Sequence, residues 1–229
     1  MKILYHKILP FFILVFVLNA CNTCINSNKV EQRIIFPSYF AQYDAATQTL
    51  TATATFQTDN ESGNYIKLSS DSYVFCNQDN MEQKSDKEHP CYYFIEKKNI
   101  PCPDMIQFNY NNDNGVIFNN KLIIKSIQIS DILLNKNQDN LVKYKGSPID
   151  ENETISVILT KNDYQYEIQP EIANDNILIV SASMLRDFKA GDYNAYLVRT
   201  SYSTSVKAMD RGGNAETNYH SKTYKITIQ

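Results

Sequence analysis

The chain of 229 residues contains no tryptophan, only six glycines and only three histidines. The few glycines form no phosphate-binding loop, and neither a G-x-S-x-G elbow nor an S-x-x-K motif occurs in the sequence. His89 and His220, the two histidines beyond the first twenty residues, form no metal-ligand spacing such as H-x-x-x-H. We therefore expect both histidines to face solvent, and we expect no catalytic, cofactor-binding or metal-binding residues.

Positive charge is also scarce. Residues 1–20 hold two lysines and no acidic residue, so the remainder of the chain carries 20 basic against 25 acidic residues. A nucleic-acid interface needs clustered lysine and arginine. The mildly acidic balance therefore argues against a nucleic-acid partner, and also against electrostatic attachment to anionic lipids.

The apolar run at the N-terminus is too short to span a membrane. It extends from Ile8 to Leu18, interrupted only by Pro10, whereas a spanning helix needs about 20 residues. Lys2 and Lys7 precede the run and small residues follow it, which is the order of a cleaved secretory signal. We predict that residues 1–20 are a signal peptide.

The end of this segment, Leu18-Asn19-Ala20-Cys21, resembles the lipobox of bacterial lipoproteins. Asn19 departs from that family, which usually has Ser, Ala, Thr or Val there. The resemblance implies that Cys21 becomes the first mature residue and carries acyl chains, such as palmitate, that anchor it in a membrane. Asn22, rather than aspartate, follows the cysteine, which implies a lipid-anchored cell-envelope protein of the outer membrane. The alternatives are an ordinary secretory signal and an uncleaved anchor.

Four further cysteines, an even number, fit an oxidising compartment and predict disulfides. Cys76, Cys91 and Cys102 fall within 27 residues, so we predict one bridge among them. Either Cys91–Cys102 joins a local hairpin or Cys76–Cys91 closes a charged loop. Cys24 lies in a polar segment, residues 21–30, that we expect to be a flexible tether. The spacing of Cys21 and Cys24 is not a redox motif, because no strand and helix follow it.

Short segments with strand patterns fill the rest of the chain. The clearest lies within residues 47–56, where Leu50, Ala52, Ala54 and Phe56 alternate with threonines. About a dozen such segments follow one another at short spacing, and the only helical pattern, residues 183–189, is long enough for one or two turns. This pattern predicts an all-β fold of antiparallel sandwiches.

The length fits two immunoglobulin-like antiparallel β-sandwich domains in tandem, each of about 100 residues. We place the first over residues 31–130 and the second over residues 131–229. The Cys…Trp…Cys pattern of antibody domains is absent, since the chain has no tryptophan. The likeness therefore concerns architecture only, and a single larger sandwich is the alternative.

Fifteen tyrosines follow residue 20. They fit sheet faces and cores, which we favour, or an exposed surface for a protein or glycan partner. Those on apparently mixed faces are Tyr92, Tyr93, Tyr164, Tyr166, Tyr196 and Tyr202. The mixed-charge loop over residues 77–90 is the other candidate contact segment. Residues 59–64 and 111–115 are rich in oxygen ligands, but they fit turns better than calcium sites.

Together these features predict a lipid-anchored bacterial envelope protein with a non-catalytic binding or structural role. One alternative is an accessory lipoprotein of an envelope assembly or secretion system, which an exposed apolar patch of several hundred Å² would favour. A less favoured alternative is a hydrolase on a β-sandwich scaffold, which a pocket with two carboxylates of shifted pKa would favour.

Overall fold

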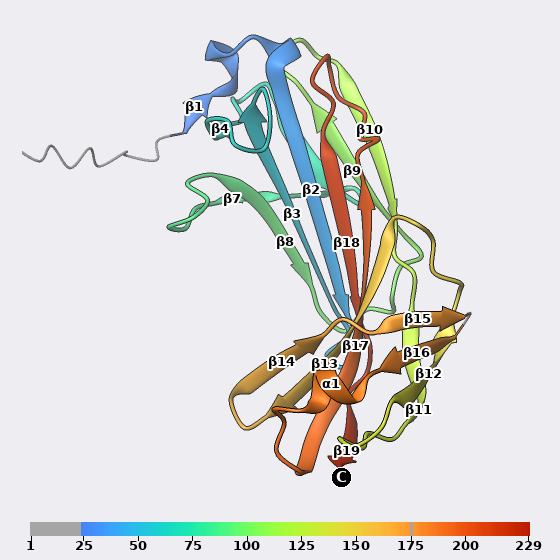
Figure 1. Cartoon of the computed structure of the whole chain (residues 1–229). Coiled ribbons are helices and arrows are strands. Elements are labelled where there is room, and N and C mark those ends of the chain that lie inside the picture. The colour runs from blue at the N-terminus through green and yellow to red at the C-terminus, as the bar shows by residue number, and fades with distance from the viewer. Residues whose placement is uncertain (1–23, 175) are drawn as a thin grey trace, which may run out of the picture.

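The computed structural model describes residues 24–174 and 176–229, almost all of them in strands or in the turns between strands. The molecule is elongated, with β1 near one end and the C-terminus at the other (Figure 1). The predicted signal peptide and Cys21 lie outside the described residues. Within the described part of the chain, no helix is long and apolar enough to cross a membrane.

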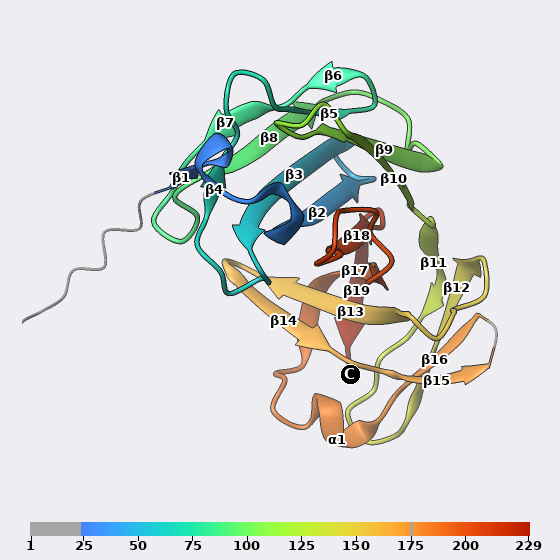
Figure 2. The same cartoon turned by 90° about the horizontal axis from the view of Figure 1, so that it is seen from above.

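One large sheet runs through the whole molecule (Figures 1 and 2). Its strand order is β14-β13-β17-β18-β2-β3-β8-β7, and β19 pairs with the first part of β17. Its members are β2 (Ile35–Asp44), β3 (Thr49–Thr58), β7 (Glu82–Lys84), β8 (Tyr92–Lys97), β13 (Glu153–Lys161), β14 (Tyr164–Ile168), β17 (Gly191–Ser203), β18 (Asn214–His220) and β19 (Tyr224–Ile228).

Two smaller sheets pack on the same face of the large sheet and complete two sandwiches. The first small sheet, in the order β10-β9-β5-β6, contains β5 (Tyr73–Cys76), β6 (Asp79–Asn80), β9 (Met105–Asn111) and β10 (Ile117–Ile123). The second, in the order β11-β12-β16-β15, contains β11 (Ile127–Ile132), β12 (Asn140–Gly146), β15 (Glu171–Asn174) and β16 (Ile177–Val180). The remaining elements are β1 (Ile25–Asn26), β4 (Ile66–Lys67), η1 (Ser27–Lys29), η2 (Gln32–Ile34) and α1 (Ala182–Leu185).

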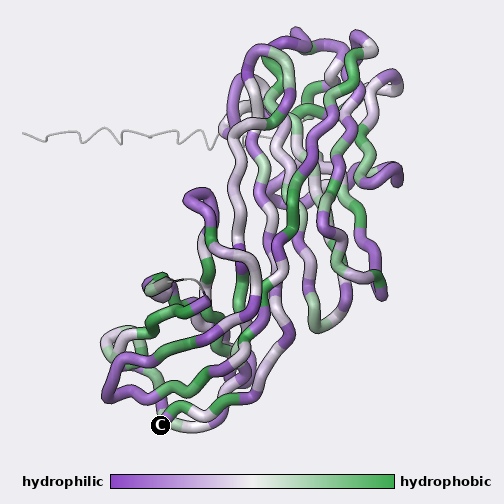
Figure 3. Tube along the Cα trace, turned by 90° about the vertical axis from the view of Figure 1, so that its right-hand side faces the viewer, coloured by the Kyte–Doolittle hydropathy of each residue, from purple (hydrophilic) through white to green (hydrophobic). Residues whose placement is uncertain are grey.

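Each sandwich has its own apolar core. In the first, the ring of Tyr39 stacks on Phe108 at 4.6 Å between centroids and meets Phe56 edge-on at 6.5 Å. In the second, Leu159 and Leu178 face each other from the two sheets and are fully buried. The alternation of apolar and polar residues that builds these cores is visible along the strands (Figure 3).

Strand β17 belongs to both sandwiches. Its 13 residues pair with β19 from Gly191 to Ala195, with β13 from Asn194 to Ser201, and with β18 from Val198 to Ser203. A strand of this length spans about 43 Å at 3.3 Å per residue. The continuous ladder therefore couples the two sandwiches along a shared strand.

The all-β sandwich class predicted from the sequence is confirmed, with two features that the patterns did not indicate. The large sheet is continuous across both sandwiches, and β18 pairs with β2 in parallel, whereas the other strand pairs of that sheet are antiparallel. Val206 and Ala215 consequently lie in the first core although they are late in the sequence. The division at residues 130 and 131 stays a prediction.

A buried ion pair lies where β17 passes from one sandwich to the other. Arg199 on β17 is only 1% exposed, and its guanidinium donates to the carboxylate of Glu153 on β13. The same guanidinium donates to the carbonyl oxygens of Ser147 (2.8 Å) and Pro148 (2.6 Å). Arg199 therefore holds the connection between β12 and β13 against the shared strand.

Glu153 is the acceptor at the centre of this cluster. Ser201 donates to one of its oxygens at 2.7 Å, and the ammonium of Lys125, just after β10, lies 2.9 Å from the same oxygen. Burial by itself raises the pKa of this carboxyl. The backbone N–H of Asp150 and the neighbouring donors outweigh that effect and lower the pKa of Glu153 to about 2.

We predict that Glu153→Gln destabilises the protein by about 3–5 kcal/mol at pH 7, because it leaves Arg199 buried without its counter-charge. The folded pKa of Glu153 lies below its unfolded value, so its stabilisation is present above about pH 5 and is lost as the pH falls toward 2. Urea unfolding should show a smaller loss of stability between pH 5 and pH 2.5 in the variant than in the wild type. Equal losses of stability in the variant and the wild type would contradict this role of Glu153.

Candidate functional site

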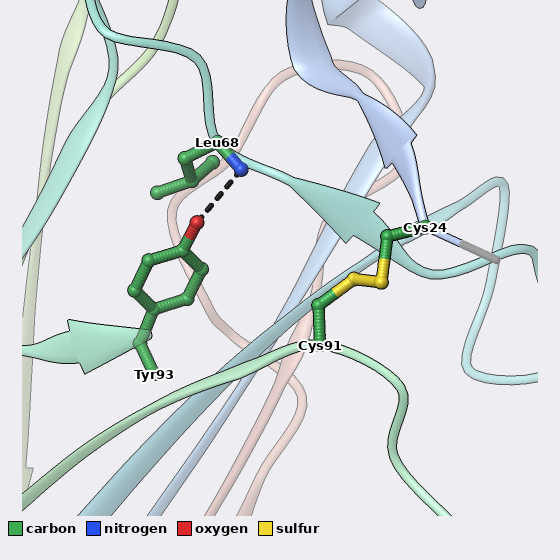
Figure 4. Close-up of a disulfide and its surroundings, with 4 residues drawn as sticks. All are labelled: Cys24, Leu68, Cys91 and Tyr93. Atoms are coloured by element: carbon green, nitrogen blue, oxygen red, sulfur yellow. Dashed lines mark hydrogen bonds between the residues drawn. A yellow bond between two sulfur atoms is a disulfide. The ribbon is translucent and has the colours of Figure 1, made fainter. Parts of the chain in front are cut away.

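The N-terminal end of the described chain is clamped to the first sandwich by a disulfide. Cys24 is bonded to Cys91, which directly precedes β8, and their Cα atoms are 6.2 Å apart (Figure 4). The next residues form β1, which pairs in parallel with β4. Two residues beyond Cys91, the Tyr93 hydroxyl accepts a hydrogen bond of 2.7 Å from the N–H of Leu68. These contacts tie the N-terminal segment, β4 and β8 into one unit.

A polar network fixes the same segment from the other side. Ser27 is fully buried; its carbonyl accepts from the Gln32 amide at 2.8 Å, and its hydroxyl accepts from the N–H of Ser69 at 2.8 Å. Asp113, at the turn between β9 and β10, accepts from the side chains of Ser69 and Gln32. Burial raises the pKa of Asp113, but these hydroxyl and amide donors more than offset it and lower the pKa.

These contacts correct two expectations from the sequence. The predicted pairings, Cys91–Cys102 and Cys76–Cys91, are wrong, because Cys91 bonds to Cys24. The expected flexible tether is wrong for residues 24–30, which form β1 and η1 and pack against the first sandwich. The segment is held by contacts with residues that are distant in the sequence. Burial of Ser27 and its bonds to distant residues hold a segment whose own sequence looks like a linker.

Cys76 and Cys102 are free thiols in the described chain. Cys76 lies in the first core, where burial raises its pKa to about 12. Cys102 is half-buried, and burial raises its pKa to about 11. Both thiols are therefore protonated at neutral pH and are poor nucleophiles.

The mixed-charge segment over residues 77–90 is more structured than a solvated loop. Asn77 and Gln78 have positive φ and turn the chain from β5 into β6. Met81 is buried in the first core, and the chain then crosses to the large sheet as its edge strand β7. In the loop that follows β7, Asp86 accepts from the N–H of His89 at 2.6 Å.

The two histidines are separate from each other. His89 is exposed, as expected, and its ring lies 6.0 Å from Tyr65 and 6.2 Å from Tyr92. His220 does not face solvent freely, which corrects the sequence expectation. It is half-buried on β18 beside Tyr196, at 5.7 Å between ring centroids, and burial lowers its pKa.

The carboxylates follow the turns rather than a common site. Asp59 pairs with Arg211 at 2.9 Å, and Asp113 belongs to the network described above. Over residues 24–174 and 176–229, no group of three or more metal-type side chains comes together. In the same ranges, each carboxyl with a shifted pKa has it lowered, as Asp86, Asp113 and Glu153 do.

The six singled-out tyrosines occupy three environments. Tyr93 is in the first core. Register places Tyr92, Tyr196 and Tyr202 on the face of the large sheet opposite the cores. Tyr164 and Tyr166 are exposed on β14, at the end of the second sandwich. The favoured interpretation of cores and sheet faces therefore fits Tyr93, Tyr92, Tyr196 and Tyr202, whereas Tyr164 and Tyr166 are exposed although their register is that of the core side.

No protein-family model matches the chain, and no curated protein does so. Solved structures align with it at low similarity. The chicken CNTN1 FN1-FN3 domains are 8% identical, with a TM-score of 0.26, over 84% of this chain and 65% of that one. Dpr11 IG1 bound to DIP-gamma IG+IG2 is 9% identical, with a TM-score of 0.22, over 81% and 98%.

The Yersinia pseudotuberculosis adhesin InvE is 9% identical, with a TM-score of 0.22, over 84% of this chain and 58% of that one. This chain thus spans less than two thirds of the length of the CNTN1 fragment and of the adhesin. At these TM-scores the alignments assign neither a family nor a ligand, and the all-β class rests on the strands themselves.

We predict that, of these four cysteines, only the two outside the disulfide react as free thiols. When the protein is unfolded without reductant and alkylated, Cys76 and Cys102 should be labelled, whereas Cys24 and Cys91 should react only after reduction. Peptide mapping by mass spectrometry identifies the labelled residues. Labelling of Cys24 in the unreduced protein, or protection of Cys102, would show a different pairing.

Proposed function

We propose that this protein is a lipid-anchored protein of a bacterial cell envelope with a non-catalytic binding or structural role. The anchor would be acyl chains on Cys21, following the lipobox-like sequence that ends there. The supporting observation is the clamp at Cys24, only three residues further along the chain. Three extended residues reach at most about 11 Å. The first sandwich would therefore stand close to the membrane instead of on a long tether.

This arrangement would orient the whole molecule. The Cys24 end would face the lipid, and the second sandwich, at the other end in Figure 1, would point away from it. Because β17 belongs to both sandwiches, the far end would be carried at a fixed height above the membrane. Surfaces at that end are the best placed to meet a partner.

A non-catalytic role is favoured over hydrolysis by the state of the carboxylates. A hydrolase that works through a pair of carboxyl groups would need one of them kept protonated as an acid, with a raised pKa. The shifted carboxyls of the described chain move in the opposite direction, and Glu153 and Asp113 are held by structural donors. A role in envelope assembly, the alternative, would also use an exposed contact surface.

We predict that Cys21→Ser releases the protein from the membrane fraction of the native host. The serine hydroxyl does not replace the acylated sulfur, so the stabilisation of about 0.8 kcal/mol per buried CH₂ is lost. The measurement is membrane fractionation together with incorporation of a labelled fatty acid.

The matched control is Cys24→Ser, which removes the disulfide and keeps the predicted acylation site. This variant should stay in the membrane fraction and should still incorporate the label. Retention of Cys21→Ser in the membrane, or absence of fatty acid from the wild-type protein, would overturn the proposal.

A further inference from the structure

The far end of the second sandwich has an aromatic hollow that the fold leaves open. Register pairs Tyr166 with Leu159 and Tyr164 with Lys161, so both tyrosines lie on the core side of the large sheet. Leu159 is fully buried, whereas Tyr164 and Tyr166 are 69% and 41% exposed. The second small sheet therefore covers β14 only at Ile168, which is buried, and the rings of Tyr164 and Tyr166 remain open to solvent on the core side.

Phe188 continues this surface, whereas Tyr193 is only 6% exposed and lies beneath it. Phe188, in the turn after α1, lies 5.0 Å from Tyr166, and Tyr193 on β17 lies 6.1 Å from Phe188. The ammonium of Lys161 sits 4.6 Å above the Tyr193 ring, and the Tyr193 hydroxyl donates to the carbonyl of Lys189 at 2.9 Å. The rings thus form a row that is held in place by contacts within the fold.

Polar groups surround the row. The hollow beside Tyr166 has a volume of about 380 Å³ and includes Lys161, Asn162 and Asp187 at its rim. This volume falls in the range of small-molecule sites, about 300–1,000 Å³. A second hollow of about 500 Å³ shares Lys161, Asn162 and Tyr193, but Asp192 and Asn194 place it on the opposite face of the large sheet. The hollow beside Tyr166 is therefore a site of its own.

We propose that this aromatic row and its rim bind an oligosaccharide. A pyranose ring has one face of C–H groups, which packs on the negatively charged face of an aromatic ring. Its hydroxyls both donate and accept, which matches the mixture of ammonium, amide and carboxylate groups at the rim.

A peptide is the rival occupant, because β14 is an edge strand of the large sheet and could pair with an added strand. Strand addition uses the backbone of β14 and does not require the row from Tyr166 to Tyr193. The row and its mixed rim therefore favour the saccharide. This inference goes beyond the proposed function and does not depend on acylation of Cys21.

The test is binding of the full chain carrying Cys21→Ser to an array of defined oligosaccharides, followed by titration of each saccharide that is retained. We expect binding that Tyr166→Ala weakens by at least about tenfold, since central aromatic contacts commonly dominate a binding surface. Lys161→Met, which keeps the aliphatic stem and removes the charge, should also weaken it.

Tyr73→Ala is the matched control. Tyr73 is 40% exposed, lies on a strand and contacts a single phenylalanine, Phe75, at 5.1 Å, but it belongs to the first sandwich. This variant should bind as the wild type does, and circular dichroism should show that all three variants are folded. Absence of any retained saccharide, or equal binding by wild type and Tyr166→Ala, would overturn the inference. Retention of a peptide panel instead would assign the site to strand addition.

Discussion

The shared strand β17 is the constraint on which the rest of the structure depends. It carries ladders to β13, β18 and β19, so the large sheet passes from one sandwich to the other through its backbone. Its own core residues, Tyr193, Ala195 and Leu197, belong to the second sandwich. Arg199 occupies the point on that strand where one core gives way to the other, and Glu153 supplies its counter-charge. An apolar side chain would fill the same place, but it would not hold the carbonyl groups of residues 147 and 148.

The consequence is that the two ends of the molecule are related by a fixed geometry. At one end, the disulfide, the β1–β4 pair and the Ser27–Gln32–Asp113 network immobilise the chain from Cys24 onward. At the other end, β14 extends beyond the sheet that would cover it and leaves aromatic side chains open. A short link to a membrane at the first end would therefore set the height and direction of the second.

Local patterns in the sequence predicted the strands well, because apolar and polar residues alternate along a strand that has one face in the core and the other in solvent. Leu50, Ala52, Ala54 and Phe56 are all buried on β3, as their alternation indicated. Features that depend on residues distant in the sequence were not predictable in this way. The partner of Cys91 is 67 residues away, and the parallel pairing of β2 with β18 joins the two extremes of the chain. Tyr166 lies on the core side of β14, opposite the buried Leu159. It is nevertheless exposed, because the second small sheet does not extend far enough to cover it.

The most direct test of the central claim, that the sandwiches form one rigid body through β17, is measurement of residual dipolar couplings for backbone amides in a weakly aligned sample. Couplings from β2, β3 and β9 in the first sandwich and from β12, β13 and β16 in the second should fit a single alignment tensor. Two tensors of different magnitude would show that the sandwiches move independently, and would contradict the claim that one end fixes the position of the other.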